Sequence, residues 1–170
     1  MQPIEMIVAR FEGTNRAVHV LDELREMDQD DEISILNAVV VKKDYQGAVE
    51  ISNDGDVRSG EGALFGALVG ALVGFLGGPA GAVVGAAAGA ITGGVTAAVI
   101  DFGFDTETLD MLKTGLTPNS SLIVALVEQE WSERVLNEIH FRHGQVIHQA
   151  LREDFSRRYA SRQRKDLNKD

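Results

Sequence analysis

The sequence predicts an α+β fold, and two observations lead to this prediction. A unit made of an apolar strand and an amphipathic helix occurs near the start of the chain and again near its end. Between the two copies, residues 62–94 carry no charged side chain and place glycine at every fourth position over two runs. We therefore expect a body formed by the two copies, with a separate helical element inserted between them.

The repeat defines the expected architecture of the body. "IVARFEGTNRAVHVLDEL", from Ile7, lies over "IVALVEQEWSERVLNEI", from Ile123, with one gap, and Glu12 corresponds to Glu128. Two copies of strand, helix and strand make a ferredoxin-like split β-α-β sandwich, an antiparallel sheet with both helices on one face. A chance likeness between two amphipathic strand–helix units is the alternative at this length.

Each element of the first half has its own local signal. A β-branched and apolar run predicts a strand over 3–13 that ends at Gly13, and Thr14 or Asn15 can cap the following helix. The inward face of that helix is predicted to carry Ala17, Val20, Leu21, Leu24 and Met27. A second, mostly apolar strand follows over 33–44, with a short hairpin partner over 45–52 that turns at Gly47. Residues 53–62 are predicted to form a polar turn.

The second half repeats the alternation of helices and strands. A short helix over 105–115 is predicted, capped by Asp105 or Thr106 and stopped by Gly115. A strand over 121–130, a helix over 131–144 and a last strand over 145–153 follow. The helix should turn Val135, Leu136 and Ile139 inward. The expected organisation is a first half over 1–43, an insertion over 44–118, a second half over 119–151 and a basic polar tail over 152–170.

The glycine-rich insertion is predicted to be a helical hairpin that packs closely. Glycine destabilises a helix by about 1 kcal/mol per position relative to alanine, so a stripe of glycines indicates backbone-to-backbone approach of another helix. The stripe comprises Gly62, Gly66, Gly70, Gly74, Gly81, Gly85, Gly89 and Gly93. Two positions out of phase lies a ridge of leucines, Leu64, Leu68, Leu72 and Leu76. Gly77, Gly78 and Pro79 should interrupt the run, giving arms over 61–76 and 79–100.

The apolar hairpin must be covered, either by lipid or by protein. The first arm would be about 24 Å long, short of the roughly 30 Å thickness of the hydrocarbon core, so insertion into a bilayer is marginal for one hairpin alone. In water, the ridge with Phe65 and Phe75 makes a patch too large to leave exposed. Either environment leads us to expect a homo-oligomer.

Composition restricts the function classes. The first 151 residues carry nine Lys and Arg against 22 Asp and Glu, whereas the last 19 carry seven against four. An acidic body repels phosphates and argues against nucleic-acid binding. The absence of cysteine excludes disulfides and thiolate metal sites. No basic leader precedes an apolar core at the N-terminus, so we expect a cytoplasmic body. Basic residues of the tail could meet anionic lipid headgroups, the alternative being a solvated, disordered tail: Arg157, Arg158, Arg162, Arg164 and Lys165.

No residue set amounts to a convincing catalytic or metal site, and we expect no cofactor. The segment from Glu50 to Glu61 partly fits a calcium loop, but a strand precedes it and a solvated turn is the simpler interpretation. His140, His143 and His148 could share a metal, although a histidine at a helix end is favourable without one. Glycines spaced by four are not a dinucleotide-binding fingerprint, and a phosphate-binding loop would need a lysine as well.

The segment that follows the glycines carries a family resemblance. The glycine-rich apolar hairpin ends in "AVIDFGFDTETLDML", and "TGLTPNSSLIVALVEQ" comes shortly after it. This order resembles the bacterial family called domain of unknown function 1269, usually described as predicted membrane proteins, over about residues 4–151. The resemblance implies a ferredoxin-like body and membrane association, and it implies no reaction and no catalytic residues.

These observations lead to two function hypotheses. The first is a non-enzymatic, membrane-associated oligomer that assembles through the glycine hairpins, with its body on the cytoplasmic side. The alternative is a soluble, cytoplasmic homo-oligomer that serves as a structural or small-ligand-binding module, with the hairpins buried in the assembly. An enzyme is a third, less favoured class.

Overall fold

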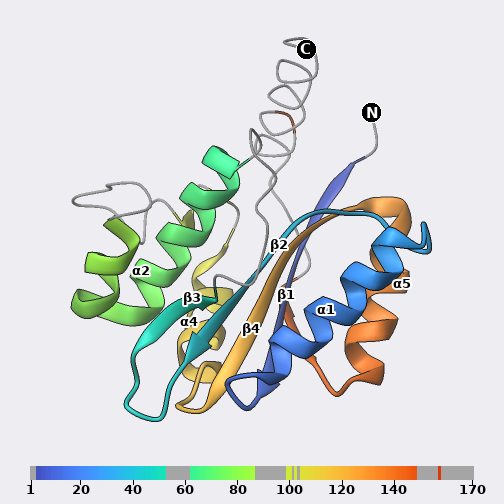
Figure 1. Ribbon diagram of the computed structural model, residues 1–170. Coiled ribbons are helices and arrows are strands. Elements are labelled where there is room, and N and C mark those ends of the chain that lie inside the picture. Colours follow the sequence, from blue (N-terminus) through green and yellow to red (C-terminus); the bar gives the residue numbers. More distant parts are fainter. Residues whose placement is uncertain are drawn as a thin grey trace.

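The computed structural model describes residues 3–52, 62–86, 99, 100, 102, 104–148 and 157 (Figure 1). The described residues form an α+β fold with a five-stranded sheet and four helices. In chain order the elements are β1 (Ile4–Glu12), α1 (Arg16–Gln29), β2 (Ile35–Lys43), β3 (Val49–Ser52), α2 (Gly62–Ala86), α4 (Thr106–Gly115), β4 (Ser120–Glu128), α5 (Gln129–Phe141) and β5 (Gln145–His148). The predicted α+β class is confirmed, and the predicted strands, the helix predicted after Gly13 and the helices predicted over 105–115 and 131–144 all have counterparts.

The strands form one antiparallel sheet with the order β3-β2-β4-β1-β5. The two strands of the sequence repeat, β1 and β4, are neighbours at its centre. They pair in a register that sets Ile7 opposite Ala125 and Ala9 opposite Ile123. Both strands are largely buried on both faces, which explains why each reads as a continuous apolar run rather than an alternating one.

One face of the sheet is covered by α1 and α5, the two helices of the repeat. Val20, Leu21 and Leu24 of α1 and Val135 and Ile139 of α5 are all at most 2% exposed. They belong to one cluster with sheet residues of alternate register, Ile7, Ala9, Phe11, Val40, Ile123, Ala125 and Val127. The inward faces predicted for these two helices are thus confirmed, with Met27 and Leu136 packed at the margin of the cluster.

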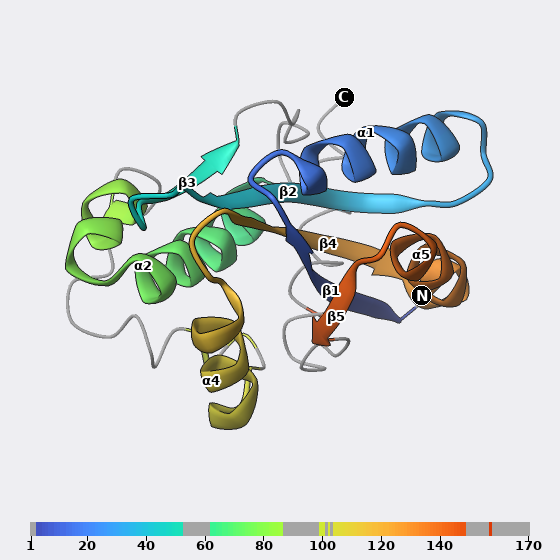
Figure 2. The ribbon, with the colours of Figure 1, turned by 90° about the horizontal axis from the view of Figure 1, so that it is seen from below.

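The opposite face is covered by α2 and α4, which lie within the predicted insertion. Figure 2 shows α1 and α5 on one side of the sheet and α2 and α4 on the other. A second cluster joins α2 and α4 to sheet residues of the other register, which are Ile4, Met6, Val8, Val39, Val41, Leu122, Val124 and Leu126. The fold therefore has three layers, and α2 and α4 form one of them.

The helices α1 and α5 end in the same way, so the repeat extends to their caps. Asp31 and His143, just past the two helices, have left-handed backbone with φ of 56° and 63°. In each case the amide of the following residue donates to the carbonyl five residues back, at 2.9 and 2.8 Å. This is the Schellman pattern, which satisfies carbonyls at a helix C-terminus. The acidic residues after α1, Asp30, Asp31 and Glu32, therefore form the C-terminal cap of this helix.

Two predicted local signals outside the repeat are also confirmed. The Asp105 carboxylate accepts a hydrogen bond from Thr108 N at 2.7 Å and so caps α4. Gly47 has φ of 89° in the turn between β2 and β3, a conformation that favours glycine. The Asp44 carboxylate closes this turn by accepting from the amides of Gln46 and Ala48, both at 2.8 Å.

The structure corrects the predicted interruption of the glycine-rich segment. Residues Gly77, Gly78 and Pro79 do not end a helix, because α2 is helical from Gly62 to Ala86. Figures 1 and 2 show the helix changing direction along its length instead. Pro79 is compatible with this geometry because a proline bends a helix without necessarily ending it. Most of the predicted second arm, residues 87–98, lies outside the described residues.

Candidate functional site

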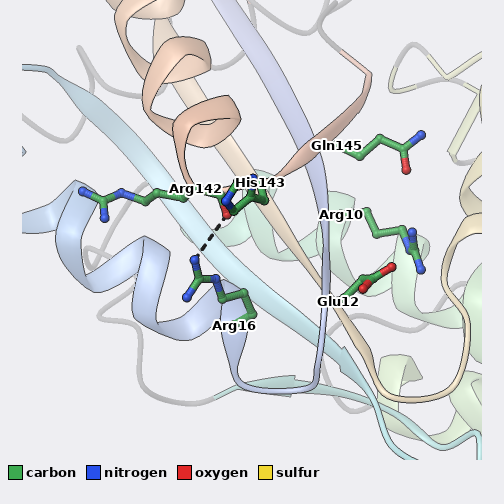
Figure 3. Close-up of a pocket in the computed structure, with 6 residues that line it drawn as sticks. All are labelled: Arg10, Glu12, Arg16, Arg142, His143 and Gln145. Carbon is green, nitrogen blue, oxygen red and sulfur yellow. Dashed lines mark hydrogen bonds between the residues drawn. The ribbon is translucent and has the colours of Figure 1, made fainter.

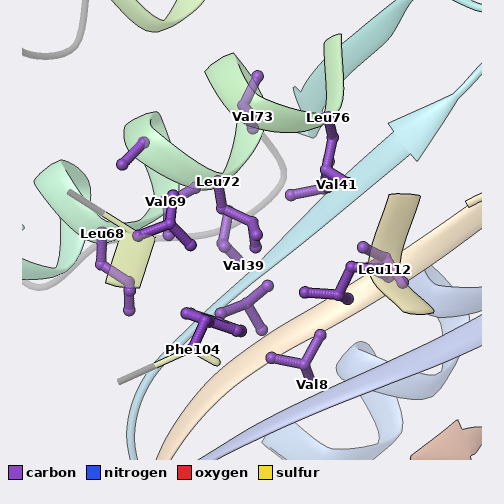
Figure 4. Packing of buried hydrophobic residues seen from close by; sticks show 14 of the residues in the cluster. Val8, Val39, Val41, Leu68, Val69, Leu72, Val73, Leu76, Phe104 and Leu112 are labelled. Carbon is purple, nitrogen blue, oxygen red and sulfur yellow. The ribbon is translucent and has the colours of Figure 1, made fainter. Parts of the chain in front are cut away.

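The predicted leucine ridge lies on the inner side of α2. Leu68 and Leu72 are fully buried and Leu76 is 8% exposed, whereas Leu64 is only partly buried. Figure 4 shows Leu72 and Leu76 extending from α2 toward the β2 residues Val39 and Val41. Leucines four residues apart stay on one stripe of a helix, so they can meet one sheet face together.

This packing corrects the expectation that a partner must cover the ridge in water. The sheet of the same chain covers Leu68, Leu72 and Leu76, since they share one cluster with its strands. Phe65, which belongs to the same predicted patch, is 1% exposed in this cluster. Phe75 is partly buried there, and the Lys113 ammonium lies 5.8 Å from the centre of its ring.

The glycines of the predicted stripe have different surroundings. Gly70 and Gly74 are buried, whereas Gly66 is partly exposed and an added Cβ there would meet nothing within 4 Å. At Gly77, which is not part of the stripe, an added Cβ would lie 3.5 Å from Val49 Cβ, an ordinary contact with β3. For Gly62, Gly81 and Gly85 only the helical backbone is described, and Gly89 and Gly93 lie outside the described residues.

The predicted basic tail and calcium-loop segment lie largely outside the described residues. Of the basic tail residues, Arg157 is described, as helical and exposed, while Arg158, Arg162, Arg164 and Lys165 are not described. The calcium-loop segment falls mainly on residues 53–61, also outside. His140 and His143 are exposed. Among the described residues, no group of three or more His, Cys, Asp or Glu side chains could hold a metal ion.

A polar pocket that the sequence did not indicate lies where β1, α1, α5 and β5 meet. Its volume is about 430 Å³, and it is lined by Arg10, Glu12, Arg16, Arg142, His143 and Gln145 (Figure 3). Arg10 and Glu12 lie at the end of β1, and Arg16 begins α1. Arg142 and His143 follow α5, and Gln145 begins β5 opposite Arg10. Three arginines thus surround one cavity in an acidic protein.

Hydrogen bonds and ion pairs hold two of these arginines in place. Arg16 Nη2 donates to the carbonyl of Arg142 at 3.5 Å, a long contact. Arg142 forms ion pairs with Glu23 and, at 3.5 Å, with Glu138. The charge of Arg142 is therefore largely balanced by carboxylates of α1 and α5, and its role is to join the two helices.

Arg10 is held by the segment between α4 and β4. Its Nη2 donates to the hydroxyl of Thr117 at 3.2 Å, and its Nε is buried without a hydrogen-bond partner. Figure 3 shows Arg10 and Glu12 on one side of β1 and Arg16 on the other. Sequence reasoning missed this set because its members come from both ends of the chain. The pairing of β1 with β5 brings them together, and no local motif encodes that pairing.

Fold and packing define the class: an α+β protein in which an uncharged, glycine-rich helix covers one face of an antiparallel sheet. The chain belongs to the family described as protein of unknown function (DUF1269), whose model matches residues 62–161. The resemblance to this family is therefore confirmed. The matched range begins at Gly62 and passes beyond residue 151, whereas the sequence predicts a likeness over about residues 4–151. It spans α2, α4, β4, α5 and β5.

The other comparisons add no relative. Neither the comparison with curated proteins nor that with solved structures found a significant match. Among the described residues, no helix has both the length and the apolar character needed to cross a membrane.

Proposed function

We propose that the protein is non-enzymatic and works as a homo-oligomer, in which a second copy packs against the open end of the glycine stripe on α2. Gly66 carries this proposal. Glycine inside a helix costs about 1 kcal/mol relative to alanine, and a Cβ at Gly66 would meet nothing within 4 Å. No contact among the described residues requires glycine there, whereas close approach of a second helix would.

The surroundings of Gly66 support a contact at this end of α2. Leu64 and Ala67 are partly exposed, and so is Phe75 further along the helix. Gly70 and Gly74 are buried, so the proposed contact is confined to the first turns of α2 and does not run along the whole stripe. A symmetric contact between two copies would place the same residues opposite each other.

A soluble assembly is favoured over the membrane-associated one because the sheet of the same chain covers the leucine ridge. One observation keeps membrane association as a second candidate: residues 62–100 carry no charged side chain. In that candidate, the basic tail residues would add attraction to anionic headgroups.

We also propose that β2, β4, β1 and β5 with α1 and α5 form a ferredoxin-like body. The strand order supports this assignment, because β4 lies between β1 and β2 and the repeat helices share one face. Strand β3 and helices α2 and α4 would then be additions to that body.

Light scattering in detergent-free buffer tests the assembly. We expect a discrete multi-subunit mass for the wild type and a smaller mass for Gly66→Leu, whose side chain blocks close approach. Gly77→Ala is the matched control, because its added Cβ meets Val49 of the same chain, and it should keep the wild-type mass. A monomeric wild type, or an unchanged mass for Gly66→Leu, contradicts the proposal. Flotation with liposomes separates the two candidates, since only the membrane-associated one should float.

A further inference from the structure

We propose that the pocket formed by β1, α1, α5 and β5 binds a phosphate group. The local charge is the first reason. The protein has a net charge of -10, yet three arginines and one glutamate line this cavity. A cavity whose charge is opposite to that of the whole molecule concentrates ligands of the sign that the rest of the surface repels.

The second reason is that two of the three arginines keep N–H donors that can bind a ligand. Arg142 is already paired with Glu23 and Glu138. Arg10 and Arg16 form no ion pair within the described part of the chain, and their hydrogen bonds go to uncharged oxygens. Their guanidinium groups therefore keep N–H donors for an anion, and planar guanidinium groups match phosphate oxygens in a bidentate geometry.

The third reason is that the site is partly preorganised. Arg10 is half-buried, its Nη2 is tied to Thr117, and its Cδ lies close to Gly115. A cation that is fixed before binding loses less conformational entropy when the ligand arrives. Gln145, which lies opposite Arg10 in the sheet register, adds an amide donor to the same wall of the pocket.

Glu12 allows a test in which a substitution should strengthen phosphate binding rather than weaken it. Its exposed carboxylate lines the cavity and lies among the cations without an ion pair in the described residues. It must repel a bound phosphate and so weaken binding. Removing this charge should strengthen phosphate binding, whereas removing Arg10 or Arg16, the two arginines without an ion pair in the described residues, should weaken it.

Isothermal titration calorimetry of the full chain with inorganic phosphate measures the affinity of the pocket for phosphate. Chloride at equal ionic strength is the reference. We expect a Kd on the order of 1 mM for the wild type. Arg10→Gln and Arg16→Gln should weaken binding about tenfold each, and Glu12→Gln should strengthen it about threefold. Arg16→Lys keeps the charge but not the planar group, and should give an intermediate value.

Arg25→Gln is the matched control, since Arg25 lies on α1 away from this pocket and should leave binding unchanged. Circular dichroism confirms that each variant is folded. The proposal fails if phosphate binds no better than chloride, or if Arg25→Gln weakens binding as much as Arg16→Gln does. Flotation with phosphatidic acid vesicles identifies the source of the phosphate. Binding to these vesicles that Arg16→Gln abolishes indicates a lipid headgroup, and binding of free phosphate alone indicates a soluble ligand.

Discussion

Ser121 of β4 caps helix α1 through Ala17, 104 positions away in the chain. Its Oγ accepts a hydrogen bond from Ala17 N at 3.2 Å and donates to the Gly13 carbonyl at 2.7 Å. Asn15 occupies the N-cap position but forms no side-chain capping bond. The cap of this helix is therefore a tertiary contact, which ties the start of α1 to the centre of the sheet.

The first prediction follows from this contact. Ser121→Ala leaves a buried amide and a carbonyl unpaired, and should lower the free energy of unfolding by about 1–2 kcal/mol. Asn15→Ala is the control, and it should have a much smaller effect because the Asn15 side chain makes no cap. Urea denaturation measures both. A larger loss for Asn15→Ala than for Ser121→Ala would show that the cap is local after all.

The leucine ridge provides the second prediction. Leu68→Ala removes a fully buried side chain from between α2 and the sheet, and should cost about 2–5 kcal/mol of stability. Leu64→Ala, at the partly exposed start of the ridge, should cost roughly 1 kcal/mol. The midpoints of thermal or urea unfolding, measured for each variant and for the wild type, give the two losses of stability. Equal small losses at both positions would mean that α2 is not packed on the sheet in solution.

Two glycines should respond to the same substitution in opposite directions. A Cβ at Gly144 would lie 2.6 Å from side-chain atoms of Ile139 and Phe11, so Gly144→Ala should destabilise the fold. Gly66→Ala meets nothing within 4 Å and should stabilise the folded chain by about 1 kcal/mol through helix propensity. Unfolding curves at low protein concentration separate this effect from assembly. Destabilisation by Gly66→Ala would point to a contact inside the chain.

The end of α1 gives a fourth prediction. Asp31 has φ of 56°, a conformation that costs a residue with a side chain about 1 kcal/mol relative to glycine. Asp31→Gly should therefore stabilise the protein. Asp30→Gly is the control, because Asp30 has φ of -87° and gains nothing from glycine. If both substitutions destabilise equally in a urea titration, the left-handed cap does not persist in solution.

The sequence by itself determined the strands and helices of the repeat and the inward faces of its two helices, but not the continuity of α2. Local signals suffice for these features, because β-branched runs, helical periodicity, Asp105 as a cap and Gly47 in a turn act within a few residues. The repeat around Ile7 and Ile123 also predicted two related halves, whose strands lie at the centre of the sheet.

Only the tertiary structure decided what each apolar surface meets. The spacing of Leu68 and Leu72 shows that one side of α2 must be covered, but it contains no information on whether lipid, a partner or the sheet covers it. The arginine pocket is a similar case, since Arg10 and Arg142 come to line one pocket only when β1 pairs with β5. Ser121 caps α1 for the same reason. Contacts between distant segments depend on how strands pair and how helices cover the sheet, and short sequence patterns do not specify either.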